Sequence, residues 1–250
     1  MMRRSILAAA TVATLMLSPA WARPDPYASA LADPARPAAD MARDADRKPA
    51  GLLAWAGVKL GDKVGEYMPG GGYFTRILAK VVGPKGKVYA FVPGEIVKLA
   101  PRFLTDAQAV TADPAFANVV VGTGSNGEFG AAEPLDIVWT SQNYHDLHGK
   151  FAPEGAATQF NAAVMKALKP GGLYVVIDHA APAGSGLKGS AAQHRIDREA
   201  VVAELTAAGF QLVGETDALA KPSDSRTTSI FDPSIRGKTD QFALKFRKPN

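Results

Sequence analysis

Short β-rich runs alternate with helical stretches along most of this sequence, and the alternation limits the possible folds more than any other feature. The runs predict strands at residues 63–67, 87–92, 118–121, 135–140, 173–178, 210–215 and 241–246. Strands separated by helices form a mostly parallel sheet with helices on both faces. The last two runs are joined by a link without clear helical periodicity, so the final strand is expected to run antiparallel to its neighbour. The sequence therefore predicts a doubly wound α/β sheet.

The composition narrows the class of protein further. The chain has 250 residues, is 47% apolar, has no cysteine and carries a formal net charge of +4. These values exclude a disordered chain, a disulfide scaffold and a cysteine-ligated metal protein. Loss of Arg3 and Arg4 with a leader segment would lower the charge to about +2, which gives no reason to expect a nucleic-acid or anionic-membrane partner.

The first 22 residues have the pattern of a secretory signal. Arg3 and Arg4 are followed by an apolar stretch at residues 6–17 and by the small-x-small site Ala20-Trp21-Ala22. The stretch is too short for a membrane span, which needs about 20 apolar residues. We therefore expect cleavage after Ala22 and a periplasmic or secreted protein.

The remainder divides into two parts by composition. Residues 23–49 are rich in Ala, Pro and interleaved opposite charges, which indicates an N-terminal arm with a surface helix. The alternating pattern fills residues 50–250, which are expected to form one α/β domain. A polar loop at residues 218–239 is a candidate lid or contact between copies of the chain, so a homo-oligomer is one open alternative.

A glycine cluster follows the first predicted strand. Glu66 is followed by Gly70, Gly71 and Gly72, and a helix is expected to begin at Tyr73. Glycines let the backbone turn sharply and let a ligand approach the main chain closely. The carboxylate of Glu66 suits an amine or hydroxyl group, whereas a dinucleotide phosphate site would favour glycine there. The alternative is a turn that serves only the strand-to-helix geometry.

Polar side chains follow the fourth and fifth predicted strands. Asn143 and His145 follow the strand expected at residues 135–140, and His179 follows the strand expected at residues 173–178. Adjacent parallel strands end at the same edge of a sheet, so these side chains are expected to share a pocket. His145 is the candidate base, Asn143 could orient an acceptor, and His179 could assist. Purely structural hydrogen bonds by the histidines are the alternative.

The same residues have one other interpretation. His145 and His148, with Asp146 between them, have the spacing of metal ligands, and His179 could add another. Histidines three apart in a loop are common without a metal. No metal is therefore expected.

Several separated motifs resemble the class I S-adenosylmethionine-dependent methyltransferases, and more closely a family of exported predicted methyltransferases with the glycine motif Glu-x-x-Pro-Gly-Gly-Gly. The matching segments are residues 66–72, 47–49, Asn143-Tyr144-His145-Asp146, 169–172, 235–240 and 248–249. The resemblance covers most of residues 40–249. It implies a Rossmann-like sheet of seven strands with the last antiparallel, S-adenosylmethionine as cofactor and a small-molecule substrate.

The resemblance also implies which residues bind the cofactor. The residues carried over to cofactor binding are Glu66, Gly70, Gly71, Gly72, Tyr73 and Glu95. Met68 stands where the class has glycine. The second strand lacks the acid that usually binds both ribose hydroxyls, and the third lacks the acid that often binds adenine. Either Glu95 and Asn126 replace them, or the cofactor binds weakly, or the ligand is a different molecule.

Two functions follow from these observations. The leading one is S-adenosylmethionine-dependent methyl transfer to an unidentified small molecule. The alternative is an exported, non-catalytic small-molecule binding protein on the same fold. The missing acids after the second and third strands favour the alternative, whereas Glu66 and the Asn143-x-His145 cluster favour the enzyme.

Overall fold

The computed structural model of the chain describes residues 25–125 and 130–250. The expected signal, residues 1–22, and Asn126 lie outside the described residues. Within the described part, no helix combines the length and apolar character needed to cross a bilayer.

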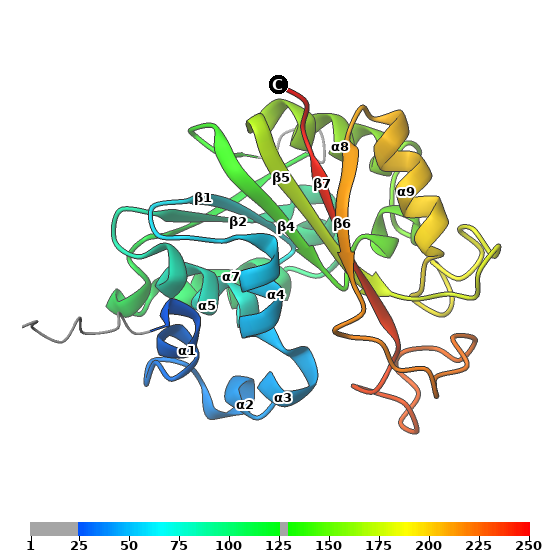
Figure 1. The fold of residues 1–250 in the computed structure, drawn as a ribbon, viewed down its shortest axis with the longest axis horizontal. Coiled ribbons are helices and arrows are strands. Elements are labelled where there is room, and N and C mark those ends of the chain that lie inside the picture. The colour runs from blue at the N-terminus through cyan, green and yellow to red at the C-terminus, as the bar shows by residue number, and fades with distance from the viewer. Residues whose placement is uncertain (1–24, 126–129) are drawn as a thin grey trace, which may run out of the picture.

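A seven-stranded sheet forms the centre of the molecule (Figure 1). Its strands are β1 (Lys63–Tyr67), β2 (Lys87–Pro93), β3 (Val119–Gly124), β4 (Leu135–Ser141), β5 (Leu168–His179), β6 (Gln211–Thr216) and β7 (Gln241–Arg247). They lie in the order β3-β2-β1-β4-β5-β7-β6. The pairs among β1 to β5 are parallel, whereas β7 pairs antiparallel with both β5 and β6. The predicted α/β sheet with an antiparallel last strand is confirmed.

Helices cover both faces of this sheet. They are α1 (Pro26–Leu31), α2 (Ala38–Met41), α3 (Asp44–Arg47), α4 (Pro49–Ala56), α5 (Tyr73–Val82), α6 (Gly94–Leu99), α7 (Arg102–Thr111), α8 (Ala156–Ala167) and α9 (Arg198–Ala207). Two 3₁₀ turns lie at Pro114–Phe116 and His145–His148. Figure 1 shows α1, α4 and α5 on one side of the sheet and α8 and α9 on the other.

Alternation along the central strands builds two apolar cores. In β4, Ile137 and Trp139 pack with residues of α4 and α5, whereas Val138 between them packs with residues of α8 and α9. Successive side chains of a strand point to opposite faces, so a strand covered on both faces is apolar at nearly every position. This explains why the predicted strands appeared as continuous apolar runs.

Local contacts set the start of α9 and the irregular start of β5. The Asp197 carboxylate accepts a hydrogen bond from the Glu199 amide and caps α9. The strand expected from residue 173 begins earlier, at Leu168. Leu135 pairs with Leu168 and Ile137 with Leu173, so β5 bulges between these pairs, with Gly171 at φ +73°.

The segment before α4 packs against the sheet domain. It forms the short helices α1 to α3, and Tyr27 donates a hydrogen bond from its hydroxyl to the Val58 carbonyl. The Arg36 guanidinium is buried and pairs with Asp44 at 2.7 Å. Asp44 in turn accepts a hydrogen bond from Tyr73, the first residue of α5. These contacts place α3 beside the start of α5.

Candidate functional site

The reversal of strand order lies at β1. The chain goes from β1 outward to β2 and β3, and then crosses to β4 on the other side of β1. Ligands of doubly wound sheets bind at such a point, beyond the carboxyl ends of the strands. The candidate site is therefore built from the segments that follow β1, β2, β4 and β5.

The turn after β1 has the open geometry that a ligand needs. Gly70 has φ +56°, and a Cβ added at Gly70 or at Gly71 would meet no atom within 4 Å. Gly72 differs, because a Cβ there would lie 2.4 Å from Val110 of α7. Gly70 and Gly71 therefore border open space, whereas Gly72 allows α5 to begin close to α7.

Glu66 lies in β1, the strand that precedes this turn. Its side chain is buried and accepts a 2.6 Å hydrogen bond from the Thr75 hydroxyl. Burial raises the pKa of Glu66 to about 7, although Thr75 and the charges of Arg47 and Arg76 act in the opposite direction. A ligand cation near this carboxylate would favour its charged form.

Asn143 ties the segment after β4 to the end of β1. Its side-chain amide donates to the carbonyl oxygens of Tyr67 and Met68, at 2.9 and 3.1 Å. Its Oδ1 atom is buried and has no hydrogen-bond partner among the described residues. A buried acceptor without a partner costs free energy unless a ligand or water donates to it.

Glu95 follows the end of β2, in the first turn of α6. Its Oε2 atom is buried and likewise has no hydrogen-bond partner in the described part of the chain. This carboxylate therefore lies just after the end of β2, and its role in binding ribose hydroxyls stays a prediction.

Arg47, at the end of α3, brings a positive charge to the same region. Its guanidinium lies 4.4 Å from the ring centre of Tyr73 and donates to the Gln142 side chain at 2.7 Å. No carboxylate oxygen of the described residues lies within 4.0 Å of it, and burial lowers its pKa to about 10. A cavity of about 490 Å³ opens beside Arg47, Gln142 and His179.

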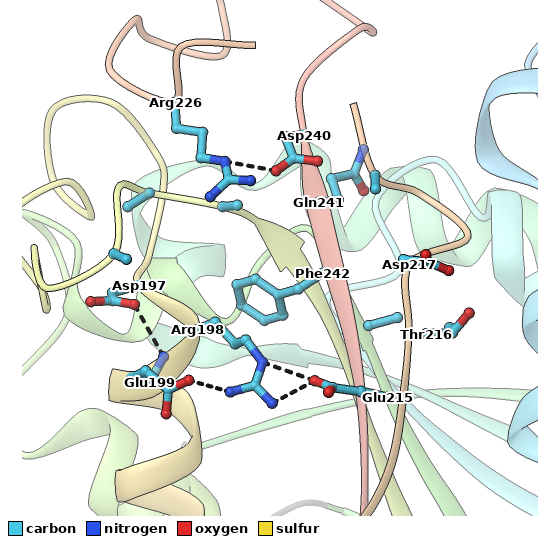
Figure 2. Close-up of a pocket in the computed structure, with 15 residues that line it drawn as sticks. Asp197, Arg198, Glu199, Glu215, Thr216, Asp217, Arg226, Asp240, Gln241 and Phe242 are labelled. Atoms are coloured by element: carbon cyan, nitrogen blue, oxygen red, sulfur yellow. Dashed lines mark hydrogen bonds and ion pairs between the residues drawn. The ribbon is translucent and has the colours of Figure 1, made fainter. Parts of the chain in front are cut away.

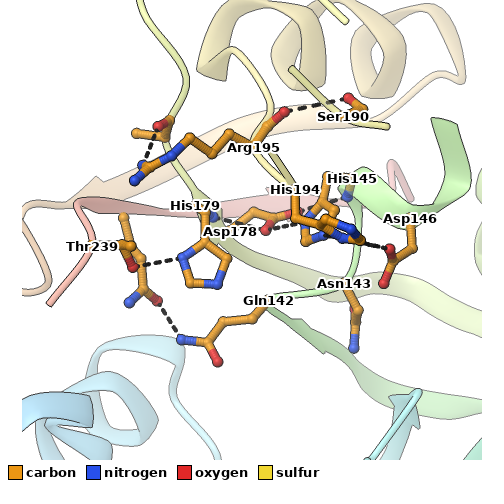
Figure 3. A network of polar contacts seen from close by, with 12 residues as sticks. Gln142, Asn143, His145, Asp146, Asp178, His179, Ser190, His194, Arg195 and Thr239 are labelled. Atoms are coloured by element: carbon orange, nitrogen blue, oxygen red, sulfur yellow. Dashed lines mark hydrogen bonds and ion pairs between the residues drawn. The ribbon is translucent and has the colours of Figure 1, made fainter. Parts of the chain in front are cut away.

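His145 and Asp178 form a buried pair at the ends of β4 and β5. The Asp178 carboxylate accepts from the His145 ring Nδ1 and from its backbone amide, both at 2.7 Å. Burial opposes charge on both groups, but their mutual attraction raises the pKa of His145 and lowers that of Asp178. The other ring nitrogen of His145 faces His194 Nδ1 at 3.2 Å (Figure 3).

His179 lies beside this pair, with its ring centre 6.1 Å from that of His145. Its Nδ1 lies 2.8 Å from the Thr239 hydroxyl. Burial lowers the pKa of His179 to about 4, with the charges of His145 and Arg195 adding to the effect and Asp178 opposing it. His179 is therefore neutral at pH 7.

The structure brings most of the predicted site residues to one edge of the sheet. Asn143, His145 and His179 are neighbours there, and their roles in a reaction stay predictions. Tyr73 points toward the N-terminal helices, since its hydroxyl donates to Asp44. His148 does not join the three neighbours, because its ring Nε2 contacts the Glu204 carboxylate at 3.0 Å.

His194 is a site residue that the sequence analysis missed. It lies in the long connection after β5, and a bridge between Ala180 and Ile196 returns that connection to the strand end. No periodic pattern marks such a return. A usable signal is that the chain has only four histidines, of which His194 is the one left unassigned.

Backbone strain gathers at this edge. Met68, Gln142 and His194 have φ values of +49°, +64° and +55°, which side chains other than glycine rarely adopt. Met68 and Gln142 directly follow β1 and β4. Strained residues of this kind cluster at functional sites, where the surrounding packing holds them.

A second cavity, of about 580 Å³, lies beside β6 and β7 (Figure 2). Arg198 and Arg226 line it, and they pair with Glu215 and Asp240 respectively. None of the residues predicted from the sequence to be catalytic or to bind the cofactor lines this cavity, and its arginines already have carboxylate partners.

No family model matches the chain. Over 125 residues it is 32% identical to a protein-L-isoaspartate O-methyltransferase of Ignicoccus hospitalis, a match that covers 50% of this chain and 51% of that protein. The chain thus matches about half the length of this curated relative.

Solved structures resemble nearly the whole described fold. A SAM-dependent methyltransferase from Aquifex aeolicus matches with a TM-score of 0.58 and 20% identity, over 80% of this chain and 89% of that one. The glycopeptide N-methyltransferase MtfA complexed with sinefungin gives 0.56 and 15%, over 81% and 86%. The cyclase SpnF gives 0.59 and 16%, over 82% of each chain. The chain therefore has the seven-stranded Rossmann-like fold of the class I S-adenosylmethionine-dependent methyltransferases.

Proposed function

We propose that this protein transfers a methyl group from S-adenosylmethionine to a small-molecule acceptor. The fold alone does not carry the proposal, because SpnF is named as a cyclase and one fold hosts several reactions. The main support is the open glycine turn at Gly70 and Gly71, together with the buried carboxylate of Glu66 in the strand that precedes the turn. The relative named as an isoaspartate O-methyltransferase supports the same reaction class.

The residues around the turn fit the parts of the cofactor. Glu95 Oε2 could accept from the ribose hydroxyls, and Asn143 Oδ1 could accept from the methionine ammonium group. Arg47 is a half-buried cation that lacks a carboxylate partner among the described residues, which suits a ligand carboxylate. When bound, S-adenosylmethionine supplies a methyl group on a positively charged sulfur. The chain's own residues then hold the donor and the acceptor in line.

The cavity beside His179 is the proposed place for the acceptor. It is lined by Arg47, Gln142 and Thr239 as well as His179. Neutral His179 can accept or donate a hydrogen bond, whereas both ring nitrogens of His145 already have neighbours. We propose that His179 orients the acceptor and that His145 is held in place by Asp178.

Calorimetric titration of the purified chain with S-adenosylmethionine and with S-adenosylhomocysteine tests this function. We expect both to bind with micromolar dissociation constants. If neither binds at millimolar concentration, methyl transfer is ruled out and the small-molecule binding protein becomes the better description. Binding of both without transfer to any acceptor would favour a binding protein that retains the cofactor site. We propose in addition that the chain is exported after cleavage at Ala22.

A further inference from the structure

Three possible metal-binding atoms form a small triangle at the carboxyl edge of the sheet. His145 Nε2 lies 3.2 Å from His194 Nδ1 and 3.4 Å from Asp146 Oδ1, and the latter two atoms lie 3.5 Å apart. The same three residues meet the geometric requirement for a shared ion. Figure 3 shows the two rings and the Asp146 carboxylate turned toward one another.

The edges of this triangle match a tetrahedral zinc site. With Zn–N and Zn–O bonds of about 2.0 to 2.1 Å, two ligands of a tetrahedral ion lie about 3.3 to 3.4 Å apart. An octahedral ion with ligands at the same distance would bring neighbouring ligands to about 3.0 Å. The side chains therefore need only small adjustments to hold Zn²⁺.

Asp178 supplies the outer contact that such a histidine ligand needs. Its Oδ1 lies 2.7 Å from His145 Nδ1, so in the neutral ring that donates to Asp178 the lone pair is on Nε2, which faces Asp146 and His194. Metal-bound histidines almost always donate their other ring N–H to a carboxylate or carbonyl oxygen. The second carboxylate oxygen of Asp178 accepts from the His145 backbone amide, so Asp178 holds both the ring and the backbone of His145.

The cluster is closed on one side and open on the other. The His145 side chain is 2% exposed, whereas those of Asp146 and His194 are 29% and 33% exposed. His194 is held at φ +55°, with its ring packed edge-on against Phe231. Catalytic zinc sites have this arrangement of three protein ligands and one position left for water or substrate.

We propose that His145, Asp146 and His194 bind one divalent transition-metal ion, for which Zn²⁺ is the best fit. This differs from the sequence-based expectation of no metal, and it also differs from the His145, His148 and His179 set considered there. The proposal does not depend on methyl transfer, because it concerns the affinity of the metal-free chain for the ion.

The test is a titration of the chain, produced without a histidine tag and stripped of metal, with ZnSO₄ alone. We expect one Zn²⁺ per chain, a dissociation constant below about 100 µM and a rise in Tm on binding. Co²⁺ in the same site should give the strong visible absorption of four-coordinate Co²⁺. A dissociation constant weaker than about 100 µM would overturn the proposal.

Matched variants locate the binding. His194→Ala and the isosteric Asp146→Asn should each weaken Zn²⁺ binding at least about 100-fold. The side chains of His194 and Asp146 are partly exposed, so we expect both variants to keep the fold. Far-UV circular dichroism of the metal-free variants checks this. His148→Ala is the control, since that histidine contacts Glu204 instead, and it should bind as the parent does. Unchanged affinity in the first two variants, or an equal loss in the control, would contradict the site.

Discussion

Asp178 holds His145 through two hydrogen bonds of 2.7 Å, one to the ring and one to the backbone amide. The two side chains come from neighbouring strand ends and are almost fully buried. Burial opposes charge on both groups, but their attraction raises the pKa of His145 and lowers that of Asp178. The pair fixes the orientation of the ring toward Asp146 and His194.

Breaking this pair should be costly. Asp178→Asn removes the buried carboxylate that accepts hydrogen bonds from His145, and removing one partner of a buried pair of this kind destabilises proteins by about 3 to 5 kcal/mol. Urea unfolding in the presence of a chelator measures the change in free energy. The control is Glu215→Gln, which removes an exposed partner of Arg198 and should cost less than about 1 kcal/mol. A comparably small loss in Asp178→Asn would mean that the pair does not stabilise the fold.

The glycine turn offers a sharper test at Gly71 than at Gly70. A branched side chain at Gly70 would strain a backbone with φ +56°, whereas Gly71 lies outside that region and borders open space. Gly71→Val should therefore keep its stability and weaken S-adenosylhomocysteine binding at least about 10-fold. Gly51→Val, an exposed position in α4 with equally open surroundings, should bind normally. Normal binding by Gly71→Val would leave the turn with a purely structural role.

The sequence predicted the sheet well because the central strands are covered on both faces. Val138 and Trp139 contact different helix layers, so both must be apolar, and the run is visible without any structure. The start of β5 was less predictable. Its first residue pairs with β4 before a bulge that contains Gly171, and a bulge of this kind looks like an ordinary turn in a sequence.

The candidate site was predictable only in part. Strand ends gave Glu66, Asn143 and His179, because parallel strands deliver the residues that follow them to one edge. His194 was not predictable in this way. It reaches the site through a long connection whose return depends on the bridge between Ala180 and Ile196. Tertiary contacts of that kind leave no periodic signal.

The export proposal has a direct test. If residues 1–22 are a signal, the exported chain should begin at Arg23, and intact-mass measurement of the purified protein should show the loss of those residues. Replacing Ala20 and Ala22 with bulky residues should block cleavage at that site. Exported protein that retains Met1 would contradict the proposal.

Arg47 is expected to bind a carboxylate, which could belong to the cofactor or to the acceptor. Arg47→Met keeps the length of the stem and removes the charge. Loss of a charged hydrogen bond of about 1.5 to 3 kcal/mol should weaken S-adenosylhomocysteine binding about 10- to 100-fold. Methylthioadenosine lacks the carboxylate, so its binding should not change. If both ligands bind as before, Arg47 does not hold the cofactor carboxylate. The control is Arg43→Met, because Arg43 is an arginine that is paired with Asp40.

The pH dependence of stability should report on Glu66. Its pKa is about 7 in the folded chain, against the ordinary value of 4.5, so between these values the folded state binds more protons than the unfolded state. The free energy of unfolding should therefore fall as pH rises from about 4.5 to 7, by about 3 kcal/mol from this group. Glu66→Gln should remove that part of the slope, whereas the exposed control Glu154→Gln should keep the parent profile. Urea unfolding at several pH values measures the free energy of unfolding. If its pH dependence is identical in the parent and in Glu66→Gln, Glu66 is charged throughout this range.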